Sequence, residues 1–343
     1  MTNLLNSNFE MADLHIKQDI AAGMIAIIAI HNLNNGPALG GCRFVSYPSV
    51  DDAILDAMKL ARAMTYKSAM AGLPLGGGKA VIISRPEIAD RKKMFEAFGD
   101  FVNSLNGKYI TASDSGSNEE DMKIIATRTR FVTSINKRSE ATDDTAAMTA
   151  SGMLRAIEAA VQYRFNKSSL DGIHVAIQGV GSVGYRLARL LLDKGARLTL
   201  TDKNKDLLHR STNELSASMV DPDKIMEVAC DIFSPCALGG ILNATSIAKL
   251  KTAIICGAAN NQLQTKEDGE SLRKKDIVYV PDYVANAGGV ICAAAQAGVI
   301  SNQDSYQKVA DIYQSVLEVL TTAKDSGLTT EVVANQLAEK RFK

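Results

Sequence analysis

A glycine pattern between an apolar segment and a helical one places the strongest constraint on the fold of this chain. Gly179, Gly181 and Gly184 stand between an apolar run, 174–178, and a pattern with helical spacing, 185–194. In that setting the first glycine permits a tight turn and the second lets the backbone approach a pyrophosphate. The third lets the helix pack on the strand. The pattern predicts a Rossmann dinucleotide-binding domain.

An acidic residue follows the next predicted strand, 197–201. Asp202 stands at the distance at which a carboxylate bonds the ribose hydroxyls of NAD and disfavours the 2′-phosphate of NADP. Ser182 and Val183 lie in the same turn, just before the helix whose N-terminal N–H groups suit the phosphates. NAD is the expected cofactor. NADP remains an alternative because the basic residue Lys203 is adjacent. The other interpretation of Asp202 is that it is only a turn residue at the end of the strand.

Length and composition indicate a globular protein of two domains. The chain has 343 residues, of which 46% are hydrophobic and 22% charged, too many residues for one typical core. Lys plus Arg and Asp plus Glu both number 38, so no net charge attracts nucleic acid or a membrane surface. Five cysteines without a Cys-x-x-Cys pair indicate neither a disulfide framework nor a zinc site, and no metal is expected.

The expected compartment is the cytoplasm. The N-terminal residues lack the basic and apolar regions of a signal peptide. The apolar run Met24–Ile30 is too short to span a bilayer.

The first 140 residues show alternating strand and helix patterns, which indicate an α/β domain. Gly76, Gly77 and Gly78 are expected to break the chain. Strands are expected at 24–30, 80–83 and 109–111, with helices from a Ser49 cap to about Lys67 and over 92–105.

The predicted architecture has two α/β domains with a cleft between them. Residues 1–140 form the substrate and oligomerisation domain, 141–325 the Rossmann domain, and 326–343 a C-terminal helix that returns to the first domain. The boundary rests on the polar stretch 136–144. Beyond it a helix is expected over 146–163, strands around 231–233, 253–255 and 277–280, and helices over 303–324 and 330–341.

Two lysines and one aspartate are candidates for acid–base chemistry. Lys67 ends an apolar-faced helix, Lys79 follows three glycines, and Asp114 stands where a strand runs into a loop. Two lysines brought close together repel, and burial adds a desolvation cost. Both effects favour the neutral amine, which acts as a general base. Taken singly, a lysine is usually a solvated surface group and an aspartate before Ser-Gly a turn residue.

Several segments together resemble the glutamate/leucine/phenylalanine/valine dehydrogenase family, with leucine-type members the nearest. They follow the family order from about residue 20 to beyond residue 320. The matching segments are Gly36-Pro-Ala-Leu-Gly-Gly41, Met64-Thr-Tyr-Lys67, Gly76-Gly-Gly-Lys79, the Asp114 loop, Gly179-Val-Gly-Ser-Val-Gly184, Asp231–Leu238, Ala259–Leu263 and Pro281–Gly289.

The resemblance implies reversible NAD-dependent oxidative deamination of an apolar L-amino acid to the 2-oxo acid and ammonia. It implies that Lys67 binds the substrate carboxylate, that Lys79 is the general base that activates water, and that Asp114 shuttles protons. Gly40 and Gly41 would line the substrate site. Asn261 would contact the substrate or the nicotinamide side, Asn260 would belong to the same cofactor-binding loop, and Thr149 would lie near the nicotinamide amide.

Four positions bear on the choice of amino acid. Glutamate-specific relatives carry a lysine where this chain has Leu39, so a second carboxylate would find no counter-charge. Leu39, Ala112 and Val290 resemble the leucine type, whereas Ala293 is smaller than the valine expected there. A branched aliphatic substrate is favoured, with mixed activity on Leu, Ile, Val and Met.

Two alternatives remain: a phenylalanine/tryptophan-type dehydrogenase of the same family, and a non-catalytic NAD-binding regulatory protein. The segment Ala141–Met148 departs from the family pattern, as do Cys42, Ser115 and Asn118. Expected partners are the amino acid, its 2-oxo acid, ammonium and further copies of the chain. A dimer and an octamer are equally compatible with the sequence.

Overall fold

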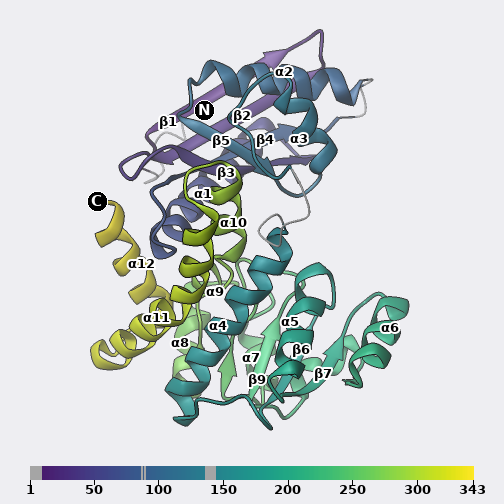
Figure 1. Ribbon diagram of the computed structural model, residues 1–343, viewed down its shortest axis with the longest axis vertical. Coiled ribbons are helices and arrows are strands. Elements are labelled where there is room, and N and C mark those ends of the chain that lie inside the picture. Colours follow the sequence, from purple (N-terminus) through teal and green to yellow (C-terminus); the bar gives the residue numbers. More distant parts are fainter. Residues whose placement is uncertain (1–9, 86–87, 89, 136–143) are drawn as a thin grey trace. The chain divides into compact units, whose positions relative to one another are not determined.

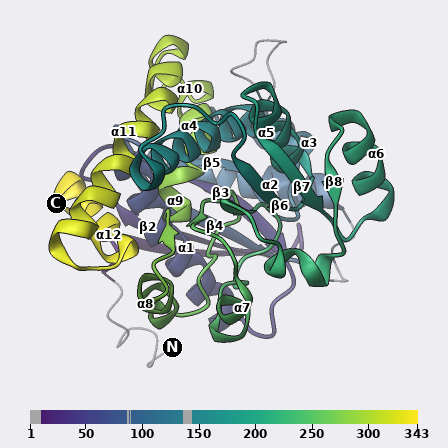
Figure 2. The same ribbon diagram turned by 90° about the horizontal axis from the view of Figure 1, so that it is seen from below.

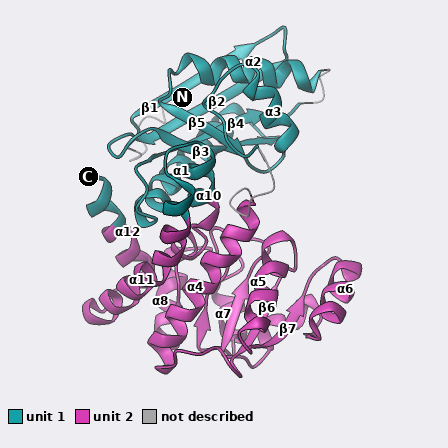
Figure 3. Ribbon diagram, in the orientation of Figure 1, with its two compact units in different colours: residues 1–143, 290–305, 338–343 teal, residues 144–289, 306–337 magenta. Residues whose placement is uncertain are grey.

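The computed structural model describes residues 10–85, 88, 90–135 and 144–343, and the chain separates into two compact units (Figure 3). Unit 1 comprises residues 1–143, 290–305 and 338–343, and unit 2 comprises 144–289 and 306–337. Each unit contains a sheet and helices, which confirms the predicted two-domain α/β architecture. The stretch 136–143, where the boundary was expected, lies outside the described residues.

Unit 1 is built on a five-stranded mixed sheet with strand order β1-β2-β4-β3-β5 (Figure 1). Strand β1 is antiparallel to β2 and β2 to β4, whereas β3 runs parallel to both β4 and β5. The strands are β1 (Asp13–Asp19), β2 (Met24–Asn32), β3 (Ala38–Val45), β4 (Gly76–Ile83) and β5 (Tyr109–Ser113).

Successive side chains of the interior strand β2 pack into two different cores, because a strand presents alternate residues to opposite faces. Ile27 packs with α1 (Val50–Met70), whereas Ile28 packs with the cluster that includes α2 (Arg91–Ser104) and α3 (Glu119–Ala126). Helix α1 begins as predicted, with the Ser49 side chain accepting the Asp52 N–H.

The predicted break at Gly76–Gly78 is wrong, because all three glycines belong to β4. The strand needs them: a Cβ at Gly77 would lie 2.0 Å from the backbone nitrogen of Thr65 on α1. The helix therefore packs directly on the strand backbone. Strands β1 and β3 and helix α3 were not predicted.

Unit 2 has a six-stranded parallel sheet with strand order β11-β10-β9-β6-β7-β8. This is the strand order of a doubly wound dinucleotide-binding fold, and it confirms the predicted Rossmann domain. Helices α4 and α5 lie on one side of the sheet and α7 and α8 on the other (Figure 2). The strands are β6 (His174–Gln178), β7 (Arg197–Thr201), β8 (Ser218–Met219), β9 (Ile232–Pro235), β10 (Ile254–Ile255) and β11 (Val278–Tyr279).

The helices that were predicted in the rest of the chain are present, and their observed ends lie close to the predicted ends. Asp144 caps the first of them by accepting two backbone N–H groups. None of the helices in the described part of the chain is long and apolar enough to cross a membrane. They are α4 (Thr145–Phe165), α5 (Ser182–Asp193), α6 (Lys205–Leu215), the 3-10 helix η2 (Pro222–Glu227), α7 (Ala244–Lys249), α8 (Lys266–Lys274), α9 (Asp282–Ala285), α10 (Gly288–Gln296), α11 (Asn302–Ser326) and α12 (Thr330–Phe342).

The membership of one segment differs from the prediction. Residues 290–305, which contain most of α10, belong to unit 1 rather than to the dinucleotide-binding unit. The cause is a set of hydrogen bonds between α10 and the segment that follows β5, in which Thr133 Oγ1 donates to the Ala293 carbonyl over 3.2 Å.

Candidate active site

Lys79 and Asp114 form a buried ion pair in unit 1. Lys79 Nζ lies 2.7 Å from Asp114 Oδ2, and the two side chains are 7% and 25% exposed. Lys79 lies on β4 and Asp114 follows β5, so the two come from strands on either side of β3. Gly41 lies on that middle strand, and a Cβ there would lie 2.7 Å from the Cβ of Asp114. The missing side chain thus lets the carboxylate reach across β3 to the ammonium.

Close contacts fix the backbone of the neighbouring Gly40. A Cβ at Gly40 would lie 1.7 Å from the Gly78 carbonyl oxygen, and the buried Tyr109 hydroxyl donates to the Gly40 carbonyl over 2.6 Å. These contacts fix the backbone of the predicted substrate-lining residues without any side chain of their own.

Opposing influences act on the Asp114 carboxyl. Burial raises its pKa, but the Lys79 charge and hydrogen bond, together with the Arg43 charge, hold the pKa of Asp114 below its ordinary value. The loop is also fixed: the Asp114 N–H donates to Ser117 Oγ, which donates to the Cys42 carbonyl over 2.6 Å. Asp114 is therefore a preorganised anion.

Lys67 lies in the last turn of α1 and is half-buried. The helix extends three residues further than predicted, to Met70, and the Ala71 N–H bonds the Lys67 carbonyl. Because Thr65 packs on the backbone of Gly77, this turn of the helix lies against β4, the strand that carries Lys79.

The predicted side-chain-lining residues are all buried and all belong to unit 1. Leu39 is 2% exposed, Ala112 7%, Val290 6% and Ala293 5%. The position of α10 in this unit depends on Gln296, whose Oε1 accepts the Ser134 N–H over 3.0 Å and lies 3.1 Å from Thr133 Oγ1. Thr133 N–H in turn donates to the Thr111 carbonyl on β5.

The glycine turn of unit 2 has the local geometry of a phosphate-binding loop. Gly179 adopts φ +98°, and a Cβ at Gly184 would lie 1.9 Å from the Gly179 carbonyl oxygen. The surroundings of Gly181 are open: beyond its chain neighbours and its own helix, a Cβ there would meet no atom of the described residues within 4 Å. Gly181 precedes α5 as its N-cap and provides no side-chain cap, so the N–H groups at Ser182 and Val183 face no competing acceptor from it.

Asp202 directly follows β7 and lies beside this turn. Its Oδ2 accepts the Val180 N–H and its Oδ1 accepts the Asn204 N–H, each over 2.8 Å. The carboxylate thus orders the turn while lying at the carboxyl end of the strand, where dinucleotides bind in this fold. An open glycine, an uncapped helix start and an acid beside them fit a bound nicotinamide dinucleotide.

The other predicted residues of unit 2 lie in loops and at a helix start. Thr149 Oγ1 donates to the Thr145 carbonyl in the first turns of α4. Asn260 Oδ1 accepts a hydrogen bond from the side-chain amide of the buried Asn286 over 2.8 Å. Asn261 has φ +52° and its carbonyl accepts the Gly240 N–H. Asn261, predicted to contact substrate, therefore lies in a different unit from Lys67 and Lys79.

Some residues of the site were not predicted from the sequence. Arg43 Nε lies 3.2 Å from Asp114 Oδ2, and its Nη1 lies 2.8 Å from Asp56 Oδ2. Thr133 and Gln296 were missed as well. The only signal for Arg43 was its place two residues after Gly41, and this became informative once that segment was known to be a strand.

Comparisons with known proteins match both units. The family model described as "Glu/Leu/Phe/Val dehydrogenase, dimerisation domain" matches residues 10–131, and the one described as "Glutamate/Leucine/Phenylalanine/Valine dehydrogenase" matches residues 198–341.

Individual proteins are similar over nearly the whole chain. Leucine dehydrogenase of Thermoactinomyces intermedius is 45% identical over 97% of this chain and 91% of its own length. Phenylalanine dehydrogenase of Lysinibacillus sphaericus is 41% identical over 94% and 86%. The crystal structure of L-tryptophan dehydrogenase from Nostoc punctiforme superposes with a TM-score of 0.88 at 36% identity, over 100% of this chain and 98% of that one.

Proposed function

The chain belongs to the glutamate/leucine/phenylalanine/valine dehydrogenase family, and on that premise we propose that it catalyses NAD-dependent oxidative deamination of a branched aliphatic L-amino acid, with leucine favoured. The products are the 2-oxo acid and ammonia, and the reaction is reversible. The observation that carries this proposal is the Lys79–Asp114 pair, which is largely buried and is joined across β3 at Gly41, where no side chain intervenes.

Each charged residue has a distinct proposed role. Lys67 binds the substrate carboxylate as a fixed cation. Asp114 takes up and returns protons at the substrate nitrogen. Lys79 accepts a proton from the water that adds to the imino carbon, after which ammonia leaves. The short Lys79–Asp114 contact supports this division, because it allows a proton to pass between the two groups.

NAD, when bound, accepts the hydride from the substrate α-carbon. The residues proposed to hold it are Gly179, Gly181, Ser182, Val183, Gly184 and Asp202, with Thr149 and Asn260 on the nicotinamide side. Supporting this, the turn has open space at Gly181 and α5 lacks a side-chain cap there. The proposed choice of NAD over NADP rests on the Asp202 carboxylate, which would repel a 2′-phosphate.

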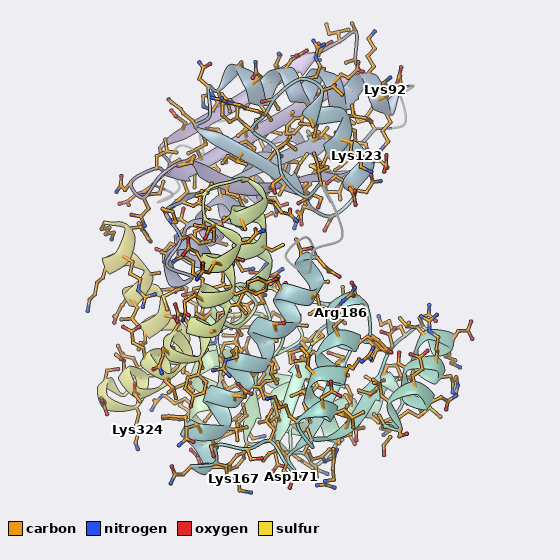
Figure 4. All side chains as sticks on the ribbon, in the orientation of Figure 1. Lys92, Lys123, Lys167, Asp171, Arg186 and Lys324 are labelled. Atoms are coloured by element: carbon orange, nitrogen blue, oxygen red, sulfur yellow. The ribbon has the colours of Figure 1, made fainter. Side chains whose placement is uncertain are left out.

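Replacing Asp202 with serine should shift the cofactor preference towards NADP. A hydrogen bond to a charged group contributes about 1.5–3 kcal/mol, so we expect kcat/KM with NAD to fall by about 10–100-fold. The ratio of kcat/KM values with the two cofactors measures the shift. Asp171→Ser is the matched control. Asp171 is exposed and precedes β6, so it lies at the amino end of the strands, whereas Asp202 lies at their carboxyl end (Figure 4). An unchanged preference in Asp202→Ser would contradict the assignment.

The proposed substrate class follows from four buried apolar side chains, Leu39, Ala112, Val290 and Ala293. None of them can offer a counter-charge to a second carboxylate, which argues against glutamate. A difference of one methylene in such a site changes discrimination by about 1–3 kcal/mol. We therefore expect overlapping activity on Leu, Ile, Val and Met rather than a single substrate.

A steady-state panel of the twenty amino acids with both cofactors tests the proposal. The expected result is NADH formation at alkaline pH that is greatest with leucine or another branched aliphatic amino acid. A clear preference for phenylalanine or tryptophan would instead assign the chain to the aromatic type, in keeping with its similarity to the L. sphaericus and N. punctiforme enzymes. The proposed assembly is a homo-oligomer, which the family description of residues 10–131 as a dimerisation domain supports.

A further inference from the structure

Asp114 has a second cationic partner that the proposed chemistry does not use. Arg43 Nε approaches Asp114 Oδ2 to 3.2 Å, the same oxygen that Lys79 Nζ contacts at 2.7 Å. Arg43 lies on β3 and Lys79 on β4, so the two cations reach the carboxylate from adjacent strands. One oxygen is therefore shared between a lysine and an arginine.

The far end of Arg43 is anchored on α1. Its Nη1 donates to Asp56 Oδ2 over 2.8 Å, and the Tyr47 hydroxyl donates to that oxygen over 2.5 Å. Burial, followed by the hydrogen bond to Asp56, raises the pKa of Tyr47. The phenol thus stays protonated and remains a donor. Because a guanidinium presents its donors in a rigid plane, fixing one end fixes the direction of the other.

We propose that Arg43 is a positioning residue for proton transfer, which keeps Asp114 ionised and correctly oriented whenever Lys79 is in its neutral, base form. This inference rests on the proposed function and extends it. The two partners differ in kind: a lysine that acts as a general base must lose its charge during the cycle, whereas an arginine does not. Without Arg43, Asp114 would lose a cation that contacts it directly at the moment when it has to exchange protons.

The charge state of Arg43 supports this role. Burial disfavours its charged form, but Asp114 and Asp56 outweigh that effect and raise the pKa of Arg43 above its ordinary value. The cation therefore persists across the working pH range. Its side chain is 26% exposed, so the attraction to Asp114 is only partly screened by solvent.

Other groups around Asp114 do not substitute for this cation. Burial raises the pKa of Cys42 and of Tyr109, so both stay neutral. Arg91 donates to the Gly116 carbonyl but is paired with Asp121. Lys79 on β4 contacts Asp114 directly, and Asp56 on α1 contacts Arg43.

Arg43→Gln tests the inference through the pH dependence of kcat/KM. Loss of the cation raises the pKa of Asp114, so the acid limb of the profile should move to higher pH. We expect kcat/KM to fall by about 10–100-fold, less than the loss expected for a group that itself transfers the proton. Arg43→Lys, which keeps a charge, should return the limb towards its original position. Asp56→Asn, which keeps Arg43 and loosens its anchor, should lower the rate and leave the limb in place.

Arg128→Gln is the matched control, because Arg128 forms an exposed ion pair with Asp100 in the same unit and should leave the profile unchanged. Circular dichroism and thermal unfolding report whether each variant is folded. The inference would be overturned if folded Arg43→Gln had the same acid limb in its kcat/KM profile as the unmodified protein. It would also be overturned if Arg43→Lys did not move the acid limb back towards its original pH. Absence of amino-acid-dependent NAD reduction in the unmodified protein would instead overturn the proposed function.

Discussion

Replacing Lys79 with alanine should lower kcat for amino-acid-dependent NADH formation by about 10²–10⁴-fold, the contribution of a general base. The methyl group of alanine cannot take a proton from the attacking water. The fold should persist, because Asp114 keeps Arg43 as a partner and no carboxylate is left without a counter-charge. NAD binding should also persist, because the glycine turn and Asp202 belong to unit 2. Steady-state kinetics at alkaline pH and titration with NAD measure the two effects separately.

Lys92→Ala is the matched control for this experiment. Lys92 lies at the start of α2 in the same unit, and its side chain is 73% exposed (Figure 4). Its loss should leave kcat and NAD binding unchanged, since exposed ion pairs contribute little. Full activity in Lys79→Ala would contradict the proposed mechanism. Loss of NAD binding in Lys79→Ala would show instead that the lysine acts on the cofactor.

Replacing Gly40 with alanine should destabilise the protein by at least about 3 kcal/mol, more than most single substitutions do. The new Cβ would lie 1.7 Å from the Gly78 carbonyl oxygen. The oxygen belongs to the backbone of β4 and the backbone of β3 fixes the Cβ, so neither can rotate away as a flexible side chain can. Strands β3 and β4 would have to separate, which would also move Lys79. Urea-induced unfolding followed by circular dichroism measures the loss.

Gly269→Ala is the control for the stability measurement. Gly269 lies inside α8, where an added Cβ would make ordinary contacts of 3.6 Å or more. Alanine is the better helix former by about 1 kcal/mol, so this variant should be as stable as the unmodified protein or slightly more stable. A Gly40→Ala variant with unaltered stability would show that β3 and β4 are not packed as closely as described.

The dinucleotide-binding unit was the easier part to predict from the sequence. Its strands β6 and β7 are apolar and short, and the glycines between them occur at positions that the turn requires. The local sequence is therefore sufficient to predict these two strands and the turn between them. Strand β8, with two paired residues, and η2 were not predicted, because they are defined by their neighbours in space rather than by a periodic pattern.

Unit 1 was harder to predict for physical reasons. In β4 the residues Gly76–Gly78 looked like a chain break, since glycine usually weakens a strand. Close packing in three dimensions explains their presence: an added Cβ would meet the Asn32 carbonyl at Gly76, Thr65 at Gly77 and the Tyr109 ring at Gly78. Strand β1 alternates half-buried and exposed residues at the edge of the sheet, so its pattern resembled a polar terminus.

The residues of the candidate site also divide into those that local sequence revealed and those that it did not. Lys67, Lys79 and Asp114 were singled out from their sequence context and from resemblance to a family. Arg43 was not, because its role depends on the order β4-β3-β5, which places its strand between those of the lysine and the aspartate. Gln296 was missed because its partner Thr133 is 163 positions away in the chain. Contacts of that range leave no local signal.

Transfer of the substrate α-hydrogen tests the central claim most directly. The protein is incubated with L-leucine carrying deuterium at the α-carbon, together with NAD, and the reduced cofactor is analysed by mass spectrometry. We expect one deuterium in each reduced nicotinamide, and 4-methyl-2-oxopentanoate and ammonia in equal amounts. A protein that binds NAD but forms no labelled NADH with leucine or any other amino acid would contradict the account.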